Sequence, residues 1–393
     1  MWRHVASNAL TFLIIALFLL AGAVSWGVTR YSSDGPLAEA ICLQVPSGGN
    51  MRGVSEDLAA QGAVTSPAIF RIGADYSDKS SQLKAGSYLI EPGTSMEGIV
   101  DAVTRGGAST CGTQVVYTVG VGGTTARVRE LDPATGRFEE IVRFDPVNEA
   151  RPAEYAAVRE ATDTQYAIQV VEGTTAWQVI TALNALDILE GSMTGVPDEG
   201  SLAPDSYEVT PGTEVSSLVA RMGAAQAQIL ADAWAARDEG LPLASPEEAL
   251  ILASIVEKET GVPEERRQVA SVFVNRLRAG MRLQTDPTVI YGVTEGQGVL
   301  GRGLRQSELR EATPWNTYVI DGLPPTPIAN PGLASIEAAL NPDTTDFVFF
   351  VADGTGGHAF ARTLEEHNRN VAVWREIEAE RAAEAEAGAA DDG

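Results

Sequence analysis

An uncharged apolar run near the N-terminus constrains this chain more than any other feature of its sequence. Residues 9–28 are rich in Leu, Ile, Phe and Ala and contain no Asp, Glu, Lys or Arg. As an α-helix with a rise of about 1.5 Å per residue, this run would span roughly 30 Å, the thickness of a bilayer's hydrocarbon core. We therefore expect residues 9–28 to enter a membrane.

Two fates are open to such a segment. It can be a cleaved signal peptide, and Ala21-Gly22-Ala23 supplies the small residues that cleavage requires. It can also be a retained signal anchor, which we favour because the apolar run continues past that site to Val28. A lone anchor with a short basic head, here residues 1–8, exports the chain that follows it. We thus expect a single-pass protein of the bacterial inner (cytoplasmic) membrane, with its main domain in the periplasm.

The charge balance narrows the choice of partners. The chain has 53 acidic and 28 basic residues, which gives a net charge of −25. Such a surface is not built to neutralise the phosphates of nucleic acid, nor to bind an anionic bilayer through a basic patch. We therefore expect no nucleic-acid partner. The hydrophobic share of 44% is ordinary for a globular protein and excludes wholesale disorder.

The cysteines and histidines give little sign of a metal. Two cysteines and three histidines show none of the spacings typical of a transition-metal site, so we expect neither metal nor cofactor. Cys42 and Cys111 both lie in the part that would be exported. In an oxidising compartment they can form a disulfide, and the alternative is two free buried thiols.

The patterning beyond the anchor predicts an α+β fold. Short apolar runs bounded by turn residues predict strands at 68–72, 86–90, 114–120, 126–131, 138–144, 167–171 and 347–352. Helical spacing of apolar residues predicts helices at 95–103, 175–186, 214–236, 246–260 and 263–279. Between them, a Gly- and Pro-rich tract at 281–334 is expected to form loops.

These elements suggest several parts along the chain. We expect a small module at 31–103, a β-rich insertion at 104–165, the main α+β domain at 166–374 and an acidic, Ala-rich tail at 375–393. The tail is interpreted as a solvated helix that frays.

The segment 245–260 carries the clearest chemical signal. Ser245 followed by Pro246 predicts the start of a helix. On that helix Glu259 shares a face with the apolar residues at 252, 255 and 256, so a carboxyl continues an apolar stripe. Burial there would raise the pKa of Glu259, as a glycosidic general acid requires. The alternative is that Glu257 and Glu259 are both exposed residues at the end of the helix.

Ordered sequence blocks over 245–370 resemble the endolytic murein transglycosylase family, whose members are also called YceG-like. The blocks are ASIVEKET at 253–260, VASVFVNRL at 269–277, MRLQTDPTVIYG at 281–292, WNTY at 315–318, GLPP at 322–325, IANPG at 328–332, FVADG at 350–354, GGHAF at 356–360 and HN at 367–368. Weaker matches extend the resemblance to about residue 166. The run KAGSY at 84–88 resembles the family's small LysM-like module, which implies that 31–103 contacts glycan.

The resemblance implies an activity and roles for particular residues. Glu259 would be the catalytic acid/base that cleaves the bond between N-acetylmuramate and N-acetylglucosamine inside glycan strands and leaves 1,6-anhydromuramate ends. By the same resemblance the protein would limit strand length beside peptidoglycan synthases. Supporting roles fall to Glu257, Asp286 and Asn316, and groove-lining roles to Gln284, Thr285 and Tyr291, with structural hydrogen bonding as the alternative for each.

Two other functions remain open. The chain could be a non-catalytic scaffold that binds peptidoglycan, or a lysozyme-like hydrolase that uses water in place of the muramate hydroxyl. An acid on an apolar stripe favours an enzyme, because a scaffold has no use for a desolvated carboxyl.

Overall fold

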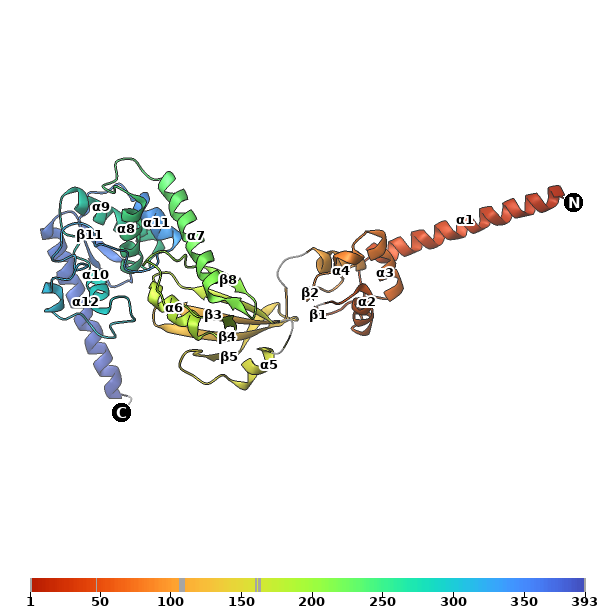
Figure 1. Cartoon of the computed structure of the whole chain (residues 1–393), viewed down its shortest axis with the longest axis horizontal. Coiled ribbons are helices and arrows are strands. Elements are labelled where there is room, and N and C mark those ends of the chain that lie inside the picture. The colour runs from red at the N-terminus through yellow and green to blue at the C-terminus, as the bar shows by residue number, and fades with distance from the viewer. Residues whose placement is uncertain (1, 47, 106–109, 160, 162–163, 392–393) are drawn as a thin grey trace. The chain divides into compact units, whose positions relative to one another are not determined.

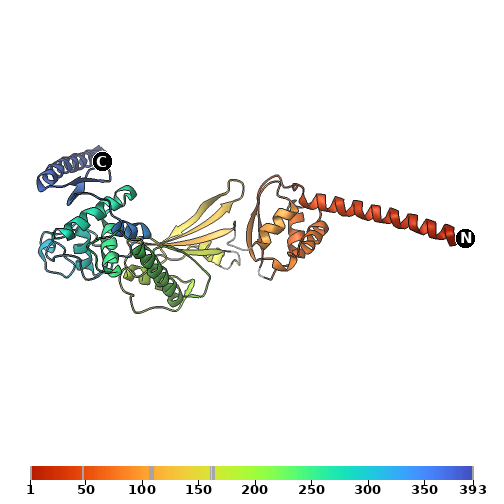
Figure 2. The ribbon, with the colours of Figure 1, turned by 90° about the horizontal axis from the view of Figure 1, so that it is seen from above.

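The computed structural model describes residues 2–391 apart from 47, 106–109, 160 and 162–163 (Figures 1 and 2). The chain forms two compact units. One comprises residues up to 116 with 127–144 and 150–166, and the other comprises 117–126, 145–149 and the chain from 167 onward. Helices and strands are mixed in both, so the α+β class is confirmed.

A long apolar helix opens the first unit. Helix α1 runs over Trp2–Ser32, and its segment Thr11–Ser32 is long and apolar enough to cross a membrane. Among the described residues it is the one helix that meets this test.

A small α+β module follows α1. Strands β1 (Ile41–Val45) and β2 (Gly86–Ile90) pair antiparallel. The helices of the module are α2 (Met51–Ala60), α3 (Pro67–Tyr76) and α4 (Met96–Thr104), with a 3-10 turn at Ser80–Gln82. Leu43, Leu58, Phe70 and Ile99 are fully buried in a core of their own. Cys42 and Cys111 form a disulfide, which settles the choice that the sequence left open.

The strand predicted at 68–72 is wrong, because these residues belong to α3. Ser66 caps this helix by accepting a hydrogen bond from the Ile69 amide, and Pro67 occupies the first turn. Within α3 the buried residues are Phe70 and Ala74, four positions apart, as on one face of a helix.

The three strands predicted between 114 and 144 are confirmed. They are β3 (Thr113–Gly120), β4 (Gly123–Asp132) and β5 (Arg137–Phe144), and the short helix α5 (Ala153–Arg159) follows. With β6 (Gln165–Val170) and β8 (Ser206–Val209) they form one sheet in the order β5-β4-β3-β6-β8. Strands from both sides of residue 165 therefore share a sheet.

Helices dominate the chain after β6. They are α6 (Ala176–Ala185), α7 (Val215–Ala235), α8 (Pro246–Glu259), α9 (Arg266–Arg278), α10 (Asp286–Thr294), α11 (Leu333–Leu340) and α12 (Leu364–Asp391). Two small pairings accompany them: β7 (Leu189–Glu190) lies parallel to β9 (Thr213–Glu214), and β10 (Phe349–Ala352) lies antiparallel to β11 (His358–Ala361). Short 3-10 turns occupy Pro263–Glu265 and Glu308–Arg310.

Helix α8 is the centre of this packing. Residues 249–256 are all buried, and α7, α9, α10 and α11 surround the helix (Figure 1). A helix covered on every side is apolar all round, which explains the run of aliphatic residues along it. The packing fixes the direction in which the last turn of α8 presents its side chains.

The tract 281–334 is not made of loops alone. It contains α10, which begins at Asp286 with Pro287 in its first turn, and the start of α11. Proline in a first turn costs no helical hydrogen bond, so Pro287, which favoured a loop in the sequence, marks a helix start here.

Candidate active site

Glu259 is the last residue of α8, where the helix emerges from the core. The Ser245 side chain accepts a hydrogen bond from the Glu248 amide at 3.4 Å, and Pro246 follows it as predicted. The apolar residues 252, 255 and 256 are fully buried. Glu259 itself is half-buried, and its Oε1 accepts a hydrogen bond from Thr285 Oγ1.

Burial governs the charge state of this carboxyl. Desolvation raises the pKa of Glu259 above its ordinary value, and the negative charge of Asp286 raises it further. The Thr285 hydroxyl and the electrostatic interactions with His358 and Arg276 act in the opposite direction, but the net shift is upward. A carboxyl in this environment holds its proton to a higher pH than an exposed glutamate does.

A buried hydroxyl cluster holds Thr285 in place. The Thr285 amide donates to Thr317 Oγ1 at 3.0 Å, and the Gln284 amide donates to the Thr317 carbonyl at 3.1 Å. The hydroxyls of Thr317 and Thr288 lie 2.9 Å apart. Thr285, Thr288 and Thr317 are all buried. The main chain around Thr285 is therefore fixed, and its hydroxyl is aimed at Glu259.

Asp286 and Gln284 flank Thr285 and are exposed. Asp286 Oδ1 accepts a hydrogen bond of 2.7 Å from the Tyr318 hydroxyl. Burial, this hydrogen bond and the charges of Asp286 and Glu259 raise the pKa of Tyr318, so the phenol stays protonated and donates. Gln284 has a φ of 49°, in the left-handed region that side chains rarely adopt.

Arg276 on α9 lies among main-chain carbonyls. Its Nε donates to the Val348 carbonyl and its Nη1 to the Leu283 carbonyl, both at 2.6 Å. The guanidinium also lies over the Phe349 ring, 5.4 Å from its centroid. Through Leu283 this cation fixes the segment that carries Thr285, and desolvation lowers its own pKa.

Three of the predicted residues lie apart from this cluster. Glu257 Oε2 accepts from the Gly332 amide at 3.1 Å, at the start of α11. The Tyr291 hydroxyl donates to Glu199 Oε2 at 3.2 Å, and its ring packs edge-on against Trp315.

Asn316, the third, is fully buried. Its Nδ2 donates to the carbonyls of Glu308 and Glu311, and its Oδ1 accepts from the Tyr318 amide at 3.0 Å. Every polar atom of this amide is thus used within its own loop. Asn316 therefore positions the main chain of Tyr318.

Sequence reasoning missed Arg276, Thr317 and Tyr318. Arg276 follows the buried residues at 269, 272 and 273 on one face of α9. It is therefore a charge that continues an apolar stripe, the same signal that identified Glu259. Thr317 and Tyr318 lie in the WNTY block of the resemblance, but no chemical pattern marked them as site residues, since their roles come from partners about 30 residues away.

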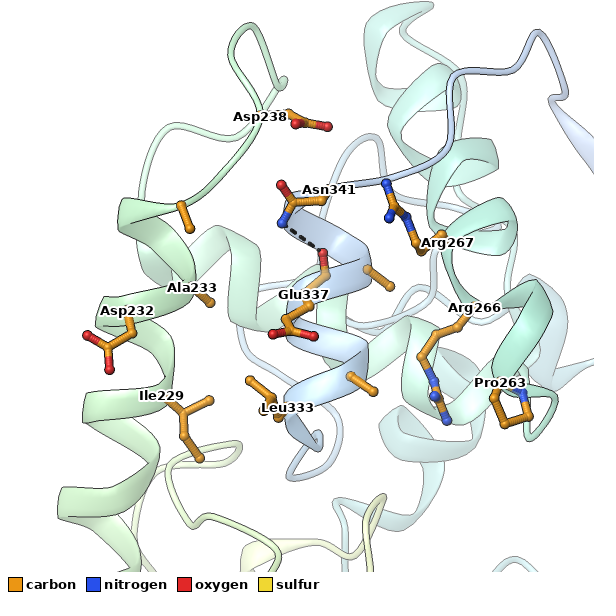
Figure 3. A pocket seen from close by; sticks show the side chains of 13 residues that line it. Ile229, Asp232, Ala233, Asp238, Pro263, Arg266, Arg267, Leu333, Glu337 and Asn341 are labelled. Atoms are coloured by element: carbon orange, nitrogen blue, oxygen red, sulfur yellow. Dashed lines mark hydrogen bonds between the residues drawn. The ribbon is translucent and has the colours of Figure 1, made fainter.

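The unit also contains a cavity that does not include this cluster. It has a volume of about 720 Å³ and lies between α7, α11 and the start of α9 (Figure 3). Ile229 and Leu333 line it together with Arg266 and Arg267, and the Asn341 side chain donates to the Glu337 carbonyl at 3.3 Å (Figure 3). Glu259, Thr285 and Asp286 are not among its lining residues.

The chain is similar to a known family and to known proteins over most of its length. The model of the YceG-like family matches residues 43–142 and 143–373. An endolytic murein transglycosylase of Streptococcus pneumoniae (serotype 2, strain D39) is 29% identical over 385 residues, which cover 94% of this chain and 65% of that protein. The chain therefore spans somewhat less than two thirds of the length of this relative.

Two further similar proteins were found. An endolytic murein transglycosylase of Bacillus subtilis (strain 168) is 27% identical over 343 residues, covering 83% of this chain and 82% of that protein. A crystal structure of a yceG-like protein from Listeria monocytogenes is 25% identical, with a TM-score of 0.43 over 84% of this chain and 99% of that one.

Proposed function

The chain belongs to the YceG-like family, and from that premise we propose that it is a membrane-anchored endolytic lytic transglycosylase of peptidoglycan. Its reaction would cut the bond between N-acetylmuramate and N-acetylglucosamine within glycan strands and so limit their length. The name carried by the pneumococcal and Bacillus relatives supports this activity. The observation that carries the proposal is the desolvated Glu259 carboxyl, held by the Thr285 hydroxyl at the end of α8.

The reaction needs one carboxyl. Protonated Glu259 gives its proton to the glycosidic oxygen as the bond from that oxygen to muramate C1 breaks. The resulting carboxylate then takes the proton of the muramate 6-hydroxyl, whose oxygen bonds to C1 and closes the 1,6-anhydro ring. The enzyme ends in its starting state and no water is consumed. Attack from within the same sugar supplies the nucleophile by proximity, so the second carboxylate of an ordinary glycosidase is unnecessary.

The neighbours of Glu259 have separate tasks in this scheme. Thr285 orients the acid, and Asp286 keeps its pKa high and faces the positive charge that develops on the sugar ring. Gln284, which is exposed beside them, would line a glycan groove, and Tyr291, which lies apart from the cluster, would line it further along α10. Glu257 and Asn316 hold α11 and the loop of Tyr318 in position.

The rest of the chain would bring this site to its substrate. Residues 9–28 serve as the inner-membrane anchor, 31–103 as a LysM-like module that contacts glycan, 104–165 as a β-rich insertion and 166–374 as the catalytic domain in the periplasm. The tail at 375–393 would be an acidic, Ala-rich appendage. The Cys42–Cys111 disulfide supports an exported location, because disulfides persist in oxidising compartments. Peptidoglycan synthases are the proposed partners.

The products of the purified full chain test this function against its two alternatives. Uncrosslinked glycan strands are incubated with the protein in detergent micelles, and the fragments are analysed by mass spectrometry. We expect internal cleavage with anhydromuramate ends, each one water lighter than a hydrolysed end. Reducing muramate ends would indicate a lysozyme-like hydrolase, and binding without cleavage would indicate a scaffold.

A further inference from the structure

Helix α3 of the N-terminal module exposes two large apolar side chains on one face. Ile72 and Tyr76 are 67% and 91% exposed, and Ala68, one turn earlier, is exposed as well. Residues four apart on a helix lie side by side, so the three form a continuous strip. A single exposed apolar residue is normal on a protein surface, but a strip of them beside a candidate membrane helix indicates a surface that contacts the membrane.

The end of α1 docks directly onto this helix. The Tyr31 ring packs against Gly73 so closely that a Cβ on Gly73 would lie 2.2 Å from Tyr31 Cε2. Just beyond α1, the Gly35 amide donates to the Gly93 carbonyl at 3.0 Å, and a Cβ on Gly35 would meet the Thr94 carbonyl oxygen at 2.3 Å. The chain therefore passes from α1 into the module through close contacts, and α3 is held beside the last turn of α1.

The position of the apolar segment in α1 determines how far the contact between Tyr31 and Gly73 lies from the hydrocarbon core. If residues 9–28 span the hydrocarbon core, Tyr31 lies three residues beyond it, about 4.5 Å further along the helix axis. The headgroup layer on each side of a bilayer is about 5–7 Å thick. Tyr31, and with it Gly73 of α3, would therefore lie within the headgroup layer.

We propose that α3 rests on the outer surface of the membrane, with Ile72 and Tyr76 inserted at the boundary between headgroups and acyl chains. This inference depends on the membrane anchor of the proposed function. The amphipathic rings of Tyr and Trp favour this depth, and Trp26 of α1 is 60% exposed near the same level. Asp75 and Asp78 beside the strip are exposed acids, so the attraction is apolar and is insensitive to salt. The contact holds the small module flat against the bilayer.

Depth-dependent quenching in vesicles tests the contact. The full chain is reconstituted into phosphatidylcholine vesicles that contain a nitroxide lipid, labelled either at the headgroup or deep in the acyl chain. A fluorophore is attached at Ala68→Cys; the two native cysteines are paired and do not react. Parallel samples carry the probe at Phe18→Cys in α1 or at exposed Glu337→Cys in α11.

We expect the headgroup nitroxide to quench the probe at 68 much more than the probe at 337, at low and high salt. Adding Ile72→Ser and Tyr76→Ser should abolish that excess, whereas Ile141→Ser, which removes an exposed apolar side chain of β5, should not. Both α3 side chains are exposed, so their loss removes no core packing.

If probes at 68 and 337 are quenched equally while the probe at 18 is quenched by the deep nitroxide, the proposed contact of α3 with the membrane surface is wrong but the membrane anchor is supported. If the probe at 18 is not quenched, the anchor fails and the contact with it.

Discussion

The hydroxyl of Thr285 donates a hydrogen bond to the carboxylate of Glu259, 26 residues away in the sequence. Glu259 ends a buried helix, and Thr285 is fixed by the main chain and hydroxyl of Thr317. The acid thus leaves the core at a point where a buried threonine supplies an oriented hydrogen-bond donor. Such an arrangement holds a protonated carboxyl in one direction, as proton transfer to a bound glycosidic oxygen requires.

Replacing Thr285 by Val should slow cleavage by up to about tenfold, since a hydrogen bond between neutral groups contributes about 0.5–1.5 kcal/mol. The hydroxyl lowers the pKa of Glu259, so its loss should raise that pKa. Activity requires protonated Glu259 and falls as pH rises through its pKa, so the alkaline limb should move to higher pH. The pH profile of kcat/KM measures this shift. Thr285→Ser keeps the hydroxyl and should retain the native limb; an unshifted limb in Thr285→Val would contradict the role.

Asp286→Asn should move the alkaline limb in the opposite direction. The negative charge of Asp286 raises the pKa of Glu259, so a neutral amide lowers that pKa and the acid loses its proton at lower pH. The same pH profile reports the change. Asp321→Asn serves as a control because Asp321 forms an exposed ion pair with Arg282. A shift of similar size in the control would show that the effect is not local.

Arg276→Met should destabilise the folded protein by about 2 kcal/mol. The substitution removes the guanidinium donor from the buried carbonyl of Leu283 and the part-buried carbonyl of Val348. Removal of a largely buried charge offsets only part of that cost. Urea unfolding followed by circular dichroism measures the loss. Arg267→Met is the matched control on the same helix, because its ion pair with Asp343 is exposed and contributes little. Equal stability of the two variants would contradict the role of Arg276 in fixing the segment that carries Thr285.

Glu259→Gln should be more stable than the native protein at neutral pH. The pKa of Glu259 is higher in the folded state than in the unfolded state. The stabilisation from the protonated carboxyl is therefore complete only at a pH below the unfolded-state pKa, and it is lost as the pH rises through the folded-state pKa. Gln is neutral at every pH, so the variant keeps its stability as the pH rises. The gap in unfolding free energy should therefore widen with rising pH, whereas exposed Glu337→Gln should show no such trend. A gap that is constant with pH would mean that Glu259 is not desolvated.

The sequence predicted the parts of this site whose causes are local. Helix α8 and the direction of Glu259 follow from a cap, a proline and an apolar period, all within 15 residues. The strand prediction at 68–72 rested on a short apolar run. It overlooked Ser66 and Pro67 just before the run, which predict the start of a helix. Pro287 misled in the same way, because proline both breaks and begins helices.

The remaining features depend on distant partners. Asn316 was predicted to have a supporting role, with structural hydrogen bonding as the alternative, and its hydrogen bonds to Glu308, Glu311 and Tyr318 exist only once the loop is folded. The pairing of Cys42 with Cys111 joins residues 69 positions apart, and composition alone could not distinguish it from two free thiols. Arg276 was predictable in principle, because a charge within an apolar stripe was already the criterion that selected Glu259.

The rate at which Glu259→Gln cleaves uncrosslinked glycan strands tests the account most directly. Gln keeps the shape of the side chain but cannot transfer a proton, so we predict a loss of about 10³-fold in anhydromuramate formation. Glu337→Gln, an exposed glutamate of the same unit, should retain the native rate. A Glu259→Gln variant that forms anhydromuramate ends within about tenfold of the native rate would contradict the account, because general acid catalysis contributes at least about 10²-fold.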